Sequence, residues 1–205
     1  TLVVSDLHFE KGSFYAARGS LLPPYDTGET LTRLEAVIHA TKPKRLIALG
    51  DSFHDLLADG RLAAPDRARL HALSRHIATI WIEGNHDPEV PAWLEGQRCH
   101  NFAHDGLFFT HIPTGARDGE VAGHLHPCAR VKGRTGPSVR RRCFLSDGTR
   151  LIMPAFGAFT GGLNVKDMAF DGLFPRPATA LVIGGTRHAP TRIRAIAQSS
   201  LSPDV

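Results

Sequence analysis

The sequence predicts an α/β protein built on a largely parallel sheet, and three observations lead to this fold class. Apolar runs at residues 45–49 and 77–82 have the length of buried strands. Residues 26–41 and 65–76 carry apolar side chains at helical spacing. Strand, helix and strand in this order are typical of parallel strands joined by right-handed crossovers.

An irregular loop is predicted for residues 12–27, after a first strand that ends at Val4. Gly12, Gly19 and a pair of adjacent prolines interrupt regular structure there. A long loop beside a site can line a substrate groove, and Arg18 is its candidate substrate contact. A plain surface excursion explains the same segment equally well.

The two predicted helices have recognisable ends. In the helix over residues 26–41, the spacing of Asp26 and Glu29 predicts a capping box. The helix over 65–76 begins at Pro65, a residue suited to a first turn.

The C-terminal part is predicted to be antiparallel. Residues 138–145 and 149–154 form a hairpin around Asp147 and Gly148, a common two-residue turn. Residues 178–183 and 192–197 are the last two strands. We expect one domain over residues 1–197 and a flexible tail over 198–205.

Composition narrows the possible locations and partners. Lys and Arg outnumber Asp and Glu by 24 to 20, so the chain carries a net charge of +4, which is compatible with a polyanionic partner. No apolar run approaches the roughly 20 residues of a membrane span. The three cysteines are far apart in the sequence, as expected for free thiols in a reducing cytoplasm.

Metal-ligand side chains follow several of the apolar runs at the point where each run ends. Ligands of open α/β sheets bind beyond the carboxyl ends of the strands. Asp6 and His8 are two residues apart, as are His124 and His126, which places each pair on one side of an extended segment. We expect a dinuclear site with seven ligands: Asp6, His8, Asp51, Asn85, His111, His124 and His126.

This ligand set predicts phosphoester hydrolysis. Asp51 can bridge two cations roughly 3.5–4 Å apart, and water held between them becomes a hydroxide nucleophile. The remaining ligands divide into two sets, with Asp6, His8 and His126 around one ion and Asn85, His111 and His124 around the other. His86 is the expected general acid for the leaving oxygen, with Asp87 orienting it.

A basic segment follows the predicted ligands. Residues 128–150 carry a net charge of +6, more than the whole chain. Arg140 and Arg142 share one face of the predicted strand and are candidate phosphate contacts. The alternative is a solvated edge strand that uses charge to prevent aggregation.

The motifs resemble those of the calcineurin-like metallophosphoesterases. They are Asp6-Leu7-His8, Gly50-Asp51, Gly84-Asn85-His86-Asp87, His111 and Gly123-His124-Leu125-His126. The resemblance implies a four-layer αββα sandwich of two mixed β-sheets flanked by helices, and the ligand and acid roles given above. Two departures are the absence of an arginine after Asp55 and the threonine that precedes His111.

Further segments look like the PdeM family of bacterial ligase-associated DNA damage response endonucleases. They include residues 12–27, 140–144 and 154–157. This likeness implies a manganese-dependent endonuclease of DNA repair that acts on single-stranded DNA alongside a DNA ligase and a helicase. Iron and zinc suit the same ligands.

Two other functions compete with DNA hydrolysis. A phosphodiesterase or phosphatase for nucleotides or another small phosphate ester is compatible with the same fold. A non-catalytic binding scaffold is disfavoured, because such scaffolds typically lose ligands or the acid histidine, and this sequence has all seven ligands and His86.

Overall fold

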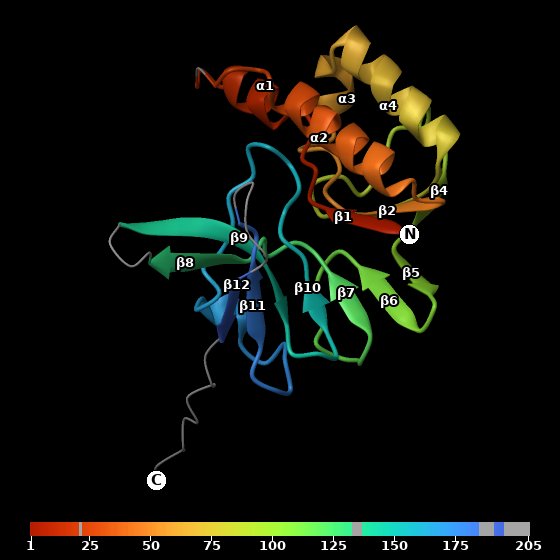
Figure 1. Cartoon of the computed structure of the whole chain (residues 1–205). Coiled ribbons are helices and arrows are strands. Elements are labelled where there is room, and N and C mark those ends of the chain that lie inside the picture. Colours follow the sequence, from red (N-terminus) through yellow and green to blue (C-terminus); the bar gives the residue numbers. More distant parts are fainter. Residues whose placement is uncertain (21, 133–136, 185–190, 195–205) are drawn as a thin grey trace.

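Two β-sheets are stacked face to face, and helices cover the outer side of the first (Figure 1). The structure is a computed structural model that describes residues 1–20, 22–132, 137–184 and 191–194. It confirms the α/β class and the pair of sheets flanked by helices. The predicted tail over 198–205, residues 195–197 of the last predicted strand and Arg134 of the basic segment lie outside the described residues.

The first sheet contains the strands that lead to the predicted ligands. Its order is β1-β2-β3-β4, and each described pair is parallel, so this sheet is not mixed. The strands are β1 (Leu2–Ser5), β2 (Arg45–Leu49), β3 (Ala78–Ile82) and β4 (Gln97–Cys99). Because parallel strands end at the same edge of a sheet, the loops that follow β1, β2 and β3 begin side by side at one rim. The last residues of these strands are Ser5, Leu49 and Ile82.

The second sheet is mixed, with the order β12-β11-β9-β10-β7-β6-β5 and with β8 paired to β9. Its strands are β5 (Asn101–His104), β6 (Leu107–Thr110), β7 (Glu120–Ala122), β8 (Cys128–Lys132), β9 (Ser138–Ser146), β10 (Leu151–Ile152), β11 (Thr179–Val182) and β12 (Thr191–Arg194). The predicted antiparallel pairs β9–β10 and β11–β12 are confirmed. Strand β8 was not predicted.

Four helices are described: α1 (Lys11–Ala16), α2 (Asp26–Thr41), α3 (Ala58–Arg61) and α4 (Ala64–His76). The two predicted helices occur as α2 and α4. The prediction of an entirely irregular 12–27 segment is wrong, because α1 lies there.

The capping box at Asp26 is also wrong. Tyr25 is the N-cap of α2 and makes no side-chain cap bond. The Asp26 carboxylate instead accepts a hydrogen bond from the Gly12 N–H at 2.9 Å, which ties α1 to α2.

Three apolar layers hold these elements together. Leu31, Leu34 and Leu70 of the helices pack on Val4 and Trp81 of the first sheet. A second layer lies between the sheets and includes Ile47, Leu49, Ile82, Phe109 and Val121. Full burial of one such side chain stabilises the folded state by roughly 1.5–3 kcal/mol.

The outer face of the second sheet is covered by irregular chain. Phe170 and Phe174 pack against Leu145 of β9 and Ala180 of β11. Within the described residues this layer contains a 3-10 turn, η1 (Met168–Phe170), in place of an α-helix.

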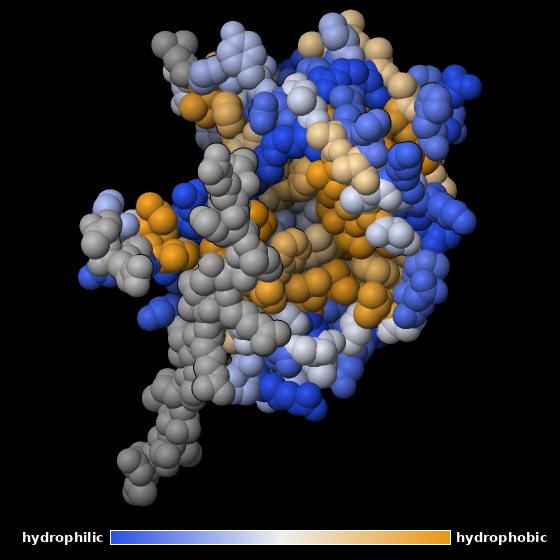
Figure 2. Space-filling model, in the orientation of Figure 1, coloured by the Kyte–Doolittle hydropathy of each residue, from blue (hydrophilic) through white to orange (hydrophobic). Residues whose placement is uncertain are grey.

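The inter-sheet layer opens to solvent along one side, where Figure 2 shows an apolar hollow. Leu2 and Val3 of β1, Phe144 of β9 and Met153 line it. In the part of the chain that the structure describes, no helix has the length and hydropathy to cross a membrane.

Candidate metal centre

All seven predicted ligands lie just beyond strand ends and converge at one rim. Asp6 and His8 follow β1, Asp51 follows β2, Asn85 follows β3, His111 follows β6, and His124 and His126 follow β7. The two sheets therefore both contribute, and the site forms only when they stack.

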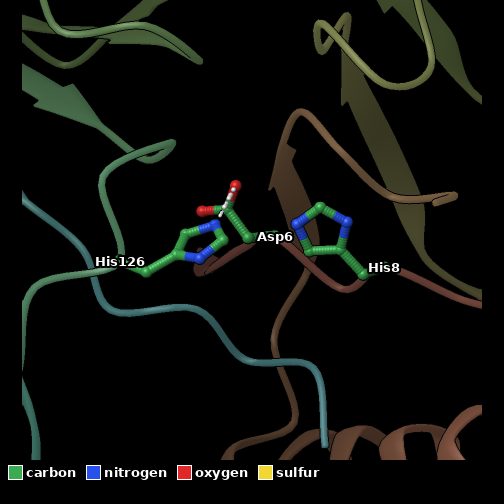
Figure 3. A group of neighbouring side chains, drawn as sticks. All are labelled: Asp6, His8 and His126. Atoms are coloured by element: carbon green, nitrogen blue, oxygen red, sulfur yellow. Dashed lines mark ion pairs between the residues drawn. The ribbon is translucent and has the colours of Figure 1, made fainter. Parts of the chain in front are cut away.

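The first group consists of Asp6, His8 and His126, whose ligand atoms lie within 4.8 Å of one another. The Nε2 atom of His126 is 3.0 Å from the Oδ1 atom of Asp6 (Figure 3). The Nε2 atoms of His8 and His126 are buried and have no hydrogen-bond partner among the described residues. A cation would satisfy both nitrogens, so this group fits a metal ion.

The second group consists of Asp51, His111 and His124. The Nε2 atom of His111 is 3.4 Å from the Asp51 carboxylate, 3.3 Å from Nδ1 of His124 and 3.0 Å from the amide oxygen of Asn85. The Nδ1–H of His111 donates to the Leu49 carbonyl at 2.9 Å. That bond orients the ring and leaves Nε2 available as a ligand.

Asp51 lies between the two groups. Its Oδ2 atom is 3.7 Å from Nε2 of His8 and 3.4 Å from Nε2 of His111. Its Oδ1 atom accepts a hydrogen bond of 2.9 Å from the His86 backbone N–H. This is the position that a bridging carboxylate requires.

Five of the seven residues have a left-handed backbone: Asp6, His8, Asp51, His124 and His126 have φ values between 45° and 68°. The sequence predicts that Asp6 and His8 share a direction because their segment is extended. That reason is wrong, since β1 ends at Ser5 and the next residues form left-handed turns. Each such residue costs roughly 1–2 kcal/mol, which the surrounding contacts must offset.

Two glycines allow the loops to approach each other. A Cβ atom at Gly84 would lie 2.1 Å from the Asp51 backbone nitrogen. One at Gly123 would lie 2.0 Å from the Ser5 hydroxyl oxygen and 2.7 Å from the Asp6 carboxylate. Any side chain at either position would push the ligand loops apart.

The surroundings of the site histidines shift their pKa values in different directions. Burial lowers the pKa of His8 to about 3, so its ring is neutral, as a metal ligand must be. Burial also acts to lower the pKa of His111, but its hydrogen bond to Asp51 and the charge of Asp6 outweigh this effect and raise the pKa to about 9. A metal ion bound at His111 would therefore displace a proton.

His86 is held by His54. Its Nδ1–H donates to the His54 carbonyl at 2.9 Å, and the two rings stack with centroids 5.0 Å apart. The Nε2 atom of His86 is therefore the one left to meet a substrate. The Nδ1 atom of His54 is also 3.2 Å from Nδ1 of His8, so His54 orients two site histidines.

Asp87, the residue predicted to orient His86, contacts the loop after β2 instead. It is buried and accepts a hydrogen bond from the Phe53 N–H at 2.9 Å, so it fixes the loop after β2. Burial raises the pKa of its carboxyl group to about 7. His54 is not among the seven predicted ligands or the predicted catalytic residues, and its one signal in the sequence is its place three residues after Asp51.

The predicted substrate arginines differ in position. Arg18 and Arg140 are exposed, and the guanidinium of Arg18 lies 3.6 Å from the centre of the Phe14 ring. Arg142 instead donates to five backbone carbonyls at 2.7–3.3 Å, those of Ala155, Phe156, Gly157, Ala158 and Thr160. This arrangement favours a structural role for Arg142.

The segment that Arg142 holds lies against the end of β1. The N–H groups of Phe156 and Gly157 donate to the carbonyls of Ser5 and Asp6, at 2.7 and 3.1 Å. Arg142 thus acts on the first ligand group through this segment.

Replacing Arg142 with alanine should lower the free energy of unfolding by about 3 kcal/mol, because several buried carbonyls lose a charged donor. It should also weaken metal binding, since Asp6 loses its support. Thermal unfolding and metal titration measure the two effects, with the exposed neighbour Arg141→Ala as the control. If Arg142→Ala reduced DNA affinity alone, Arg142 would be the substrate contact that the sequence suggested.

Comparison with known proteins agrees with this geometry. The family profile described as calcineurin-like phosphoesterase matches residues 1–152, whereas no curated protein gave a match. Among solved structures, nuclease MPE of Pseudomonas putida is 26% identical, with 88% of this chain and 86% of that chain covered and a TM-score of 0.65. Yfce, a phosphoesterase from E. coli, is 17% identical, with 95% and 98% covered and a TM-score of 0.44. The chain therefore belongs to the calcineurin-like phosphoesterases, a family of metal-dependent enzymes.

Proposed function

We propose that the protein hydrolyses phosphodiester bonds of DNA, cutting within single strands, and that it uses two divalent metal ions, with manganese as the first candidate. Support for a nucleic acid substrate comes from the nuclease of Pseudomonas putida and from the basic segment that follows the predicted ligands in the sequence. By family resemblance, the enzyme would act in cytoplasmic DNA repair with a DNA ligase and a helicase.

The seven ligand residues would hold the two ions as two groups joined by Asp51. When bound, the ions supply positive charge for the phosphate oxygens and lower the pKa of water so that it can attack phosphorus. His86 supplies the proton. Because its Nδ1–H is held by the His54 carbonyl, a proton on Nε2 faces the leaving oxygen.

One observation carries the preference for DNA over a small ester. Strands β8 and β9 form a two-stranded ribbon that extends from the body of the molecule (Figure 1). Arg130 on β8 is directly opposite Arg140 on β9, and both are exposed. No Asp or Glu occurs between residues 128 and 146. Like charges placed opposite each other are destabilising unless an anion lies between them, and a phosphate backbone supplies that anion.

The ribbon is close to the metal centre in the chain and is long enough for several nucleotides. It begins two residues after His126, a predicted ligand. The five residues of β8 span roughly 16 Å at about 3.3 Å per residue. Arg130 and Lys132 lie at the end of β8 that is farther from His126, where a nucleotide-sized ester has no use for charge, so the ribbon favours a polymer.

The double variant Arg130→Ala, Arg140→Ala tests this proposal. It should weaken binding of single-stranded DNA and reduce the slope of log affinity against log salt concentration by roughly 1.4, since about 0.7 is lost per contact. Hydrolysis of a small chromogenic phosphodiester should fall far less. The control removes two exposed charges elsewhere, with Lys44→Ala and Arg75→Ala. If both double variants behaved alike on DNA, or if small-ester hydrolysis fell instead, the small-substrate alternative would be favoured.

A further inference from the structure

A column of stacked rings runs from the metal centre to helix α1. The His86 ring stacks on the His54 ring, with centroids 5.0 Å apart and an interplanar angle of 18°. His54 in turn stacks with Tyr15 at 6.0 Å and 29°. His54 is buried inside the column, whereas Tyr15 at its outer end is 37% exposed. The column therefore ends in an aromatic ring that solvent can reach.

The residues around Tyr15 complete a small aromatic and cationic surface. Phe14 packs edge-on against the rings of His54 and Tyr15, at 4.6 and 5.4 Å. The guanidinium of Arg18 lies 3.6 Å from the centre of the Phe14 ring, and it donates to the Phe14 carbonyl at 3.1 Å. Aromatic faces with a neighbouring guanidinium are typical of sites that stack the bases of single-stranded nucleic acid.

Polar contacts that do not involve Tyr15 attach α1 to the protein. The Gly12 N–H donates to the Asp26 carboxylate at 2.9 Å, and Arg61 donates to the Ser13 hydroxyl oxygen at 2.9 Å. These buried or half-buried contacts hold the first turn at two neighbouring residues. Tyr15 takes no part in these contacts: it stacks on His54, and more than a third of its surface stays open to solvent.

We propose that Tyr15, with Phe14 and Arg18 beside it, forms a stacking site for one unpaired nucleobase of the substrate. The proposal rests on the proposed function and deepens it, since it explains a preference for single strands. Bases in a duplex are stacked on their own neighbours and cannot lie on Tyr15, whereas an unpaired base can. A base on Tyr15 would hold its strand beside the metal centre at the other end of the column.

The test compares Tyr15→Ala with Tyr15→Phe on two substrates, each assayed with added manganese. One is a short end-labelled oligothymidylate, and the other is an oligonucleotide of the same length made of abasic sites. In the wild type, the abasic strand should have the higher KM. Tyr15→Ala should raise the KM for oligothymidylate by roughly 5- to 100-fold, so that the KM ratio of the two substrates approaches one. Tyr15→Phe should behave like the wild type, because it retains the ring. Tyr25→Ala is the matched control, since Tyr25 is 74% exposed and lies outside the column.

Two results would overturn the stacking site while leaving the proposed function intact. One is an unchanged KM for oligothymidylate in Tyr15→Ala. The other is an equal rise in KM for both strands, which would mean that Tyr15 supports the fold of α1. If the wild type cleaved neither strand but hydrolysed a small phosphodiester, the proposed DNA substrate itself would be wrong.

Discussion

Asp51→Asn is expected to remove at least one bound metal ion and to lower turnover by at least about a thousandfold. The Oδ2 atom of Asp51 lies between Nε2 of His8 and Nε2 of His111, at 3.7 and 3.4 Å. An asparagine has nearly the same shape but no charge, and it offers a single amide oxygen because its amide nitrogen cannot bind a cation. The change therefore removes the bridge between the two ions without opening a cavity. Metal content of the purified protein and hydrolysis of a small chromogenic phosphodiester measure the two effects.

Asp55→Asn is the matched control for this change. Asp55 is four residues further along the same loop and pairs with Arg61 at 2.9 Å, outside both ligand groups. Its variant should keep two metal ions and most of the activity. Two bound ions with full activity in Asp51→Asn would remove Asp51 from the bridging position.

His86→Ala is expected to lower turnover by roughly 10²–10⁴-fold while both metal ions stay bound. The side chain lies exposed at the rim, and its Nδ1–H is held by the His54 carbonyl. The hydrogen bond of His86 to the metal centre is made by its backbone N–H, which donates to Asp51 and remains in the alanine variant. The loss should thus fall on proton transfer and not on metal binding.

The choice of leaving group distinguishes a loss of proton transfer from a loss of metal binding. A general acid matters most when the leaving oxygen is strongly basic, so the loss should be large for a DNA or alkyl ester and small for a nitrophenyl ester. His76→Ala, which changes an exposed histidine at the end of α4, is the control. Equal turnover of the wild type and His86→Ala on DNA would exclude the acid role.

The sequence predicted best those helices and strands whose ends are marked by residues close by in the chain. Helix α2 has the predicted bounds, because its apolar stripe is regular and Pro43 follows its last turn. Helix α1 was missed, since a glycine lies within it and its support comes from Asp26 and Arg61, which are distant in the sequence. Strand β8 was missed because its partner, β9, defines it.

The residues of the candidate metal centre could be predicted from the sequence, but their geometry could not. Each of the seven ligand-type residues comes shortly after an apolar run, and the structure brings all seven to one rim. The left-handed turns at Asp6 and His8 leave no simple trace in residue spacing. The contact of His54 with His8 and the carbonyl contacts of Arg142 depend on tertiary packing, so an arginine pattern alone could not separate a phosphate contact from a structural one.

The most direct test of the account is metal-dependent cleavage of DNA by the wild-type protein. End-labelled single-stranded DNA, the matching duplex and a small phosphodiester would be incubated with chelator-treated protein, before and after manganese is added. The account predicts internal cuts in the single strand that appear only with the metal, with slower cleavage of the duplex. DNA that stays intact while the small ester is hydrolysed, or cleavage that persists without metal, would contradict it.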